Sequence, residues 1–204
     1  MTHHYEAGRQ AFERGQYQQA IPEFQRSIVL MTEDMAGPEA IFNLAQCYAN
    51  LDQIEEYRAA MIFYVELSPD DPDPYFSLAY AALMEEDYEE CIRLSKQGRA
   101  RVRGRDPGGL INLARAYQHL GRSRESEAAL KEAIGIDPTW SDAYQALGAC
   151  YEDQLKLEQA KTYYRKAVEV DPTNHAAQRN LERLEQGFVI MGPPPPWLSE
   201  ETSR

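Results

Sequence analysis

A short pattern recurs along this chain at a step of 34 residues, and this period restricts the possible fold more than any other feature. In the two sharpest copies, Leu113 corresponds to Leu147 and Tyr117 corresponds to Tyr151. Repeats of this length form solenoids, in which each unit buries its apolar face only against its neighbours. The period therefore predicts a stacked repeat protein.

Five copies of the pattern fit one frame when two short slips are allowed. Positions 4, 7, 8 and 11 of a unit share one helical face, and positions 20, 24 and 27 share a face of a second helix. Small residues such as Gly148 let the two helices approach, and large ones such as Tyr164 fill the space between them. The expected helix-turn-helix units are 1–34, 38–71, 72–105, 107–140 and 141–174.

Turn and stop signals fall where this frame requires them. Gly15 and Gly121 mark turns between the two helices of a unit. Asp171-Pro172 marks the end of a second helix, because the residue before a proline disfavours the α region. The sequence thus predicts an all-α fold.

On these residues the chain resembles the tetratricopeptide repeat (TPR) family over about residues 1–174, most strongly in the last two units. The resemblance implies a right-handed solenoid of five TPR-like helix-turn-helix units, whose first helices line a concave groove. It also implies a non-catalytic role in holding other proteins. A few residues depart from the family pattern, namely His4, Ala11, Pro22 and Tyr57.

The residues beyond the fifth unit divide into a helix and a tail. Ala177, Leu181 and Leu184 recur at helical spacing, which predicts a capping helix over about 175–187. The run Pro193–Pro196 favours an extended polyproline II segment. The expected regions are therefore a solenoid domain over 1–187 and a Pro-rich, partly extended tail over 188–204.

The charge and apolar content of the chain argue against several classes of partner. With 21 basic and 33 acidic side chains the formal net charge is −12, which opposes binding to nucleic acid or to an anionic membrane surface. No apolar stretch approaches the roughly 18 residues of a membrane span. The N-terminal residues lack the basic start and apolar segment of a signal peptide. We therefore expect a cytoplasmic protein without membrane insertion.

Residue types that carry catalysis or bind metals do not form a recognisable site. Cys47, Cys91 and Cys150 fall at packing positions of the repeat, without the paired spacing of disulfides or zinc ligands. The glycine-rich segment 104–109 lacks the Lys-Ser/Thr pair of a phosphate-binding loop. Carboxylates are plentiful, but no pair stands out for acid–base catalysis. We expect no enzyme activity, no metal and no cofactor.

The surface of the first helices is the main candidate site. By the resemblance, positions 2, 5, 6, 9, 12 and 13 of each unit face the groove, and many hold apolar side chains. Such a strip indicates a binding surface for an extended peptide or helix, which side-chain amides could hold by its backbone. The alternative is local packing, favoured for Phe42 and Phe76 by their shared repeat position. The candidate groove residues are Tyr5, Arg9, Phe12, Phe42, Asn43, Gln46, Phe76, Tyr80, Leu83, Met84, Ile111, Asn112 and Arg115.

Some TPR proteins grip the terminal carboxylate of a peptide with Lys, Asn and Arg residues at defined inner positions. The first such window of this chain holds Tyr5, Arg9, Asn43, Asp73 and Ser77, and only Asn43 fits. The two later windows fail as well. We therefore predict no carboxylate clamp and a bound segment held by apolar side chains.

Two further segments are candidates for docking. The basic run from Arg93 to Arg105 could dock an acidic partner, or it could be a solvated helix end whose cations complement the helix C-terminus. Phe188, Ile190 and Trp197 are apolar enough to dock on this chain or on a neighbouring copy. Alternatively, Phe188 and Ile190 pack on the capping helix and Trp197 stays free.

These features together predict an adaptor or chaperone-like module that binds a protein or peptide partner in its groove. The alternative function is an oligomeric structural scaffold that assembles through the repeat ends and the C-terminal tail. A homo-oligomer belongs to that alternative, whereas a monomer favours the adaptor.

Overall fold

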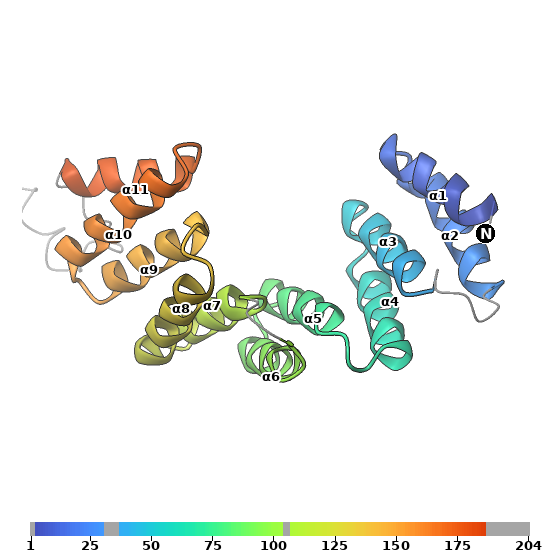
Figure 1. Cartoon of the computed structure of the whole chain (residues 1–204), viewed down its shortest axis with the longest axis horizontal. Helices are drawn as coiled ribbons and strands as arrows, with labels where there is room; N and C mark the ends of the chain where they lie inside the picture. Colours follow the sequence, from blue (N-terminus) through green and yellow to red (C-terminus); the bar gives the residue numbers. More distant parts are fainter. Residues whose placement is uncertain (1–2, 31–36, 104–106, 187–204) are drawn as a thin grey trace, which may run out of the picture. The chain divides into compact units, whose positions relative to one another are not determined.

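The structure is a computed structural model that describes residues 3–30, 37–103 and 107–186 (Figure 1). Helices and turns make up these residues, without strands, which confirms the predicted all-α fold class. The helices of the described ranges are α1 (His3–Glu13), α2 (Tyr17–Val29), α3 (Gly37–Asn50), α4 (Ile54–Leu67), α5 (Asp73–Met84), α6 (Tyr88–Arg99), α7 (Leu110–His119), α8 (Ser123–Ile136), α9 (Ser141–Asp153), α10 (Leu157–Val170) and α11 (His175–Glu185). None of them is long and apolar enough to cross a membrane.

The chain consists of two compact units, and the boundary between them lies between Asp137 and Pro138. In the first unit each helix from α1 to α8 packs on the next, and α5 also contacts α7. In the second unit α9 packs on α10, and α10 packs on α11, so α11 is the predicted capping helix. The exact frame of five repeats and the tail from residue 188 stay predictions, since the segments 31–36, 104–106 and 187–204 lie outside the described residues.

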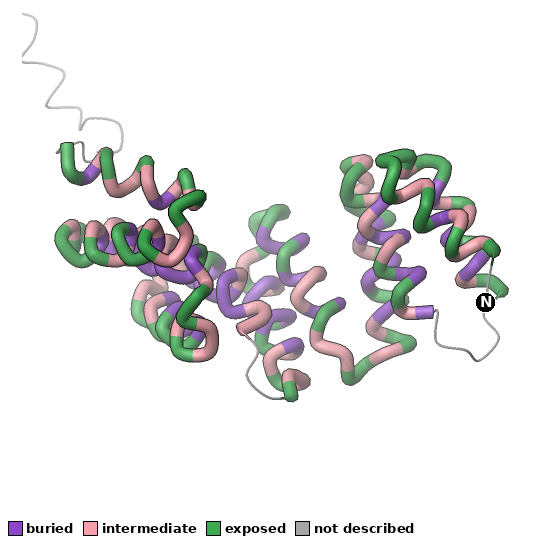
Figure 2. The backbone as a smooth tube through the Cα atoms, turned by 45° about the horizontal axis from the view of Figure 1, so that its top comes forward, coloured by how far each residue is buried: buried purple, intermediate pink, exposed green. Residues whose placement is uncertain are grey.

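Close helix packing within a pair depends on glycine opposite an aromatic ring. A Cβ atom at Gly8 would lie 2.8 Å from Cδ1 of Phe24, and one at Gly148 would lie 2.7 Å from Cδ1 of Tyr164. Both distances are shorter than van der Waals contact, so these positions accept only glycine without a shift of the ring. Figure 2 shows the buried residues along the facing sides of the helices.

The turns between paired helices share one backbone conformation but not one residue type. At the same step of each turn the φ angle is positive, although only two of the five residues are glycine. A side chain in this left-handed region costs roughly 1–2 kcal/mol, and aspartate and asparagine tolerate it best. The five residues are Gly15 (φ 71°), Asp52 (59°), Glu86 (62°), Gly121 (70°) and Leu155 (58°).

Polar contacts fix the capping helix in the second unit. Arg183 forms an ion pair with Glu152 at 2.6 Å, and the Tyr164 hydroxyl donates to the same carboxylate at 2.9 Å. Burial and the Glu152 charge raise the pKa of Tyr164, which keeps its hydroxyl a neutral donor. At the start of α11, the Asn174 side chain accepts from the backbone N–H of Ala177 at 3.0 Å and caps the helix.

Candidate functional site

Helix α5 carries the most exposed apolar side chains among the described candidate groove residues. Tyr80 and Met84 are 48% and 57% exposed, and Phe42 on α3 is 36% exposed. Leu83 and Ile111, by contrast, are buried. Among these candidates, the exposed apolar surface is therefore concentrated on α5.

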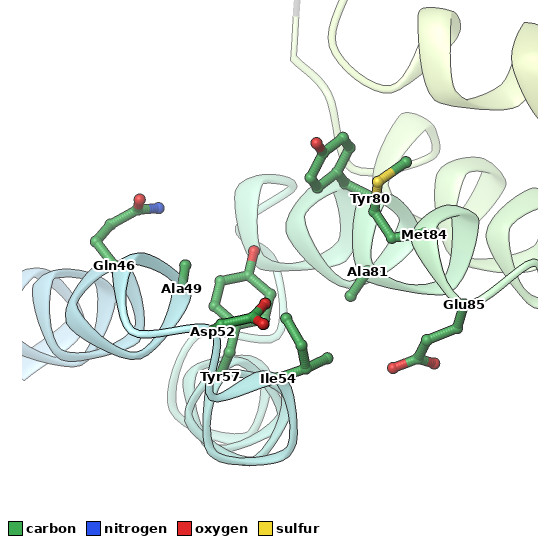
Figure 3. Close-up of a pocket in the computed structure, with 9 residues that line it drawn as sticks. All are labelled: Gln46, Ala49, Asp52, Ile54, Tyr57, Tyr80, Ala81, Met84 and Glu85. Carbon is green, nitrogen blue, oxygen red and sulfur yellow. The ribbon is translucent and has the colours of Figure 1, made fainter.

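A pocket of about 530 Å³ lies between the α3–α4 pair and α5 (Figure 3). Its volume falls within the roughly 300–1,000 Å³ of ligand-binding pockets. Figure 3 shows that the apolar lining comes from both sides, with Ala49, Ile54 and Tyr57 on one side and Tyr80, Ala81 and Met84 on the other.

Polar groups surround this pocket, and one acidic side chain stands out. Gln46, Asp52 and Glu85 complete the lining. Glu85 accepts a hydrogen bond from Arg58 at 2.5 Å, which neutralises its charge. Asp52 is exposed and forms no ion pair with any residue of the described ranges. Of the two carboxylates in the lining, that of Asp52 is therefore the one available to interact with a bound molecule.

The hydroxyl group of Tyr57 forms a hydrogen bond within the chain. It donates to the backbone carbonyl of Ser77 at 3.3 Å and so links α4 to α5. Burial raises the pKa of Tyr57, so the group remains a neutral donor. Tyr57 thus contributes its ring to the pocket.

A second pocket of about 450 Å³ adjoins the first, because Met84 lines both. Its other lining residues are Leu83, Glu86, Tyr88, Arg115 and His119. The rings of Tyr88 and His119 stack with their centroids 4.6 Å apart. The structure therefore brings five of the candidate groove residues to these two pockets, namely Gln46, Tyr80, Leu83, Met84 and Arg115.

The candidate residues near the N-terminus make contacts within the chain. Tyr5 and Phe12 pack on a core cluster that includes Phe24. The Tyr5 hydroxyl donates to Glu39 and accepts from the Asn43 amide, both at 3.3 Å. Burial and the Glu39 charge raise the pKa of Tyr5.

Arg9 lies on the same helix as Tyr5 and is paired along that helix. It forms an ion pair with Glu6 at 3.1 Å, one helical turn away. The side chain is exposed, so the pair contributes little to stability.

The Phe76 ring packs between α5 and α6 and against the residue that precedes α7. A Cβ atom at Gly98 or at Gly109 would clash with the Phe76 ring, so the ring occupies the space that both glycines leave. The Asn112 amide donates to the Phe76 carbonyl at 3.3 Å and ties α7 to α5. The packing alternative fits Phe76, whereas Phe42 at the same repeat position is exposed.

Most described cations of the basic run have partners within the chain. Arg93 pairs with Glu90 at 2.5 Å, and Arg99 pairs with Glu132. Arg101 donates to the backbone carbonyl of Pro69 at 2.5 Å. Ion pairs thus neutralise Arg93 and Arg99, whereas Arg101 keeps its positive charge beside a neutral carbonyl. Arg105 lies outside the described residues.

The candidate docking residues of the tail, Phe188, Ile190 and Trp197, also lie outside the described residues. Within the described ranges, His, Cys, Asp and Glu form no group of three or more that could hold a metal. The three cysteines are buried, and burial raises the pKa of the Cys47 and Cys91 thiols to about 11. Thiols with such pKa values are poor nucleophiles and metal ligands at neutral pH.

Sequence reasoning missed the pocket residues that belong to turns and to second helices. The groove prediction used only first-helix positions, so Asp52, Ile54, Glu86 and Tyr88 were not among its candidates. One signal was available in the sequence, because Asp52 and Glu86 stand where other repeats have Gly15 and Gly121. The signal is weak, because Leu155 occupies the equivalent position in the α9–α10 turn and lines neither pocket.

Two family models match the chain, and both are described as tetratricopeptide repeat. They cover residues 108–139 and 141–174. Among curated relatives, heat shock protein STI1 of Saccharomyces cerevisiae is 29% identical over 114 residues, which is 55% of this chain and 19% of that protein. The chain spans at most about a third of the first curated relatives that it matches.

Solved structures with a similar fold cover nearly the whole chain. TTC0263, a thermophilic TPR protein of Thermus thermophilus, superposes with a TM-score of 0.70 at 21% identity, over 90% of this chain and 97% of that one. YrrB, a TPR protein with an unusual peptide-binding site, superposes with a TM-score of 0.65 at 13% identity, over 88% and 90%. At these identities the likeness concerns the fold.

Proposed function

Because this chain belongs to the tetratricopeptide repeat family and is a protein–protein interaction module, we propose that it holds an extended peptide or a helix of a partner against α5. The proposal rests on the exposure of Tyr80 and Met84 where two pockets adjoin. A large apolar surface rimmed by polar groups is typical of a binding site. The peptide-binding site of YrrB, a protein of similar fold, supports a peptide as the ligand.

The proposed groove extends from α5 to the neighbouring first helices. Phe42 and Gln46 on α3 and Arg115 on α7 have side chains at least partly exposed. Buried or hydrogen-bonded candidates support this surface by packing and hydrogen bonds, namely Tyr5, Phe12, Asn43, Phe76, Ile111 and Asn112. Arg9 is an exposed member of the groove that pairs with Glu6. As an adaptor or chaperone-like module the protein performs no catalysis. The free thiols of its three cysteines fit a reducing compartment, so the proposed location is the cytoplasm.

A pair of matched variants tests the groove. Tyr80→Ala/Met84→Ala removes the exposed apolar side chains of α5, and Ile62→Ala/Phe63→Ala removes two from the outer face of α4. Proteins captured from the source cells by the wild-type chain, and quantified by mass spectrometry, should be lost with the α5 variant and kept with the α4 variant. Equal capture by wild type and the α5 variant would contradict the proposal.

An oligomeric scaffold is the second candidate function, and one observation favours it. Ile62, Phe63 and Leu67 on the outer face of α4 are between 41% and 48% exposed, so this face offers apolar area for another copy. The proposed docking of the tail through Phe188, Ile190 and Trp197 belongs to the same candidate. Light scattering should then show an oligomer that dissociates in Ile62→Ala/Phe63→Ala or on deletion of 188–204. A monomeric wild type excludes the scaffold.

A further inference from the structure

The pocket between the α3–α4 pair and α5 contains an acidic group that apolar binding alone does not require. Asp52 occupies the left-handed turn position, with a φ of 59°, where α1–α2 and α7–α8 have glycine. Aspartate tolerates this left-handed region better than most side chains, so the turn can carry a carboxylate here at little cost. Its carboxylate lines the pocket next to the apolar residues Ala49, Ile54 and Tyr57 (Figure 3).

The charges around the pocket leave a negative potential at Asp52. Arg58 neutralises Glu85, the other carboxylate of the lining, whereas Asp52 has no ion pair with the described residues. Arg115 lines the neighbouring pocket and not this one. The net charge of −12 adds a long-range attraction for a basic partner.

Resting on the proposed function, we infer that the partner segment places an apolar side chain in this pocket and carries an adjacent lysine or arginine that pairs with Asp52. The apolar side chain contacts Tyr57, Tyr80 and Met84, which line the pocket from both sides. The basic side chain reaches the rim, where its charge stays partly solvated. The carboxylate therefore selects among apolar segments and favours those with a neighbouring cation.

The first step of the test is a selection of peptides. The full chain, immobilised through its N-terminus, selects from a random peptide library displayed on phage, and the Tyr80→Ala/Met84→Ala variant serves as the counter-selection. The selected peptides should share an apolar residue followed or preceded by lysine or arginine. Ala49→Phe, a change at an exposed position of the pocket wall, should abolish their binding by filling the pocket.

The second step is a double-mutant cycle on one selected peptide, measured by fluorescence polarisation. Asp52→Asn removes the charge but keeps a residue that tolerates the left-handed turn, so the fold is preserved. It should weaken binding about threefold, as expected for a partly exposed ion pair. It should have no effect on an analogue whose basic residue is glutamine. Glu66→Gln, an exposed charge change on α4 outside the pocket lining, should leave the affinity unchanged.

The outcomes separate this inference from the proposed function. If peptides are selected that depend on Tyr80 and Met84 but lack a basic residue, or if Asp52→Asn and the glutamine analogue do not couple, the inference is overturned and the groove stands. If no peptide is enriched over the counter-selection, the proposed function and the inference both fail.

Discussion

The neighbouring helix pairs α3–α4 and α5–α6 are related by the 34-residue step of the sequence, yet side chains 34 residues apart have different surroundings in the two pairs. Phe42 and Phe76 occupy the same repeat position, but Phe42 is exposed and Phe76 packs against Gly98 and Gly109. The turn residues Asp52 and Glu86 are also equivalent, and they line two different pockets. The repeat position therefore determines the backbone, whereas the neighbours of each pair determine the role of the side chain.

Truncation of the two phenylalanines should give the largest contrast. Phe76→Ala leaves a cavity beside two glycines that cannot fill it, so it should lower the free energy of unfolding by about 2–3 kcal/mol. Phe42→Ala removes an exposed ring and should cost less than about 1 kcal/mol. Urea unfolding followed by far-ultraviolet circular dichroism measures both values. Equal losses would show that the two rings have the same role.

A methyl group added at Gly98 should test the contact between this residue and the Phe76 ring from the α6 side. Gly98→Ala places a Cβ atom against the Phe76 ring, closer than van der Waals contact allows, and overpacking of this kind costs about 1–3 kcal/mol. In the Phe76→Ala background the clash is absent, so the same change should be nearly neutral. The unfolding free energies of the four proteins give this coupling, and strictly additive effects would argue against the contact.

Substitutions to glycine at the left-handed turn positions should give a smaller difference, and they should increase the unfolding free energy where the substitutions above decrease it. Glu86→Gly relieves the left-handed conformation at the cost of a more flexible unfolded chain, so it should raise the unfolding free energy by about 0.5–1 kcal/mol. Asp52→Gly should change it by less than about 0.5 kcal/mol, because aspartate already tolerates this region. Thermal denaturation of the two variants compares them. A larger gain for Asp52→Gly would contradict the account of the turns.

The smallest effect expected is a pH dependence at the start of α6. The hydrogen bond from Arg93 lowers the pKa of Glu90 below its ordinary value of 4.5. The stabilisation is therefore present above about pH 4.5 and is lost as the pH falls towards the lowered pKa. The difference in melting temperature between wild type and Glu90→Gln should shrink on acidification. A difference that stays constant with pH would contradict this role of the Glu90 carboxylate.

Much of the fold could be predicted because it depends on local spacing. The 3.6-residue periodicity and the Asp-Pro stops indicate the helices, and α8 and α10 end one residue before Asp137 and Asp171. The site was harder to predict, since it depends on contacts between pairs. No repeat position reveals that Gly109, outside the unit assigned to Phe76, makes room for that ring, or that Asp52 and Ile54 line a pocket with Tyr80.

The buried cysteines of α3, α6 and α9 can be used to measure local opening of the helix pairs, because their thiols react only when the surrounding helices separate. Cys47 and Cys91 are closed off from solvent and also protonated at neutral pH, because of the pKa of about 11 that burial gives their thiols. An alkylating reagent needs an accessible thiolate, so it reacts only while the surrounding helices are apart. The labelling rate at each cysteine therefore measures how often its own helix pair opens, without any added probe. A partner that binds across α3 and α5 should slow the reaction of Cys47, which converts binding into a kinetic signal of the native chain.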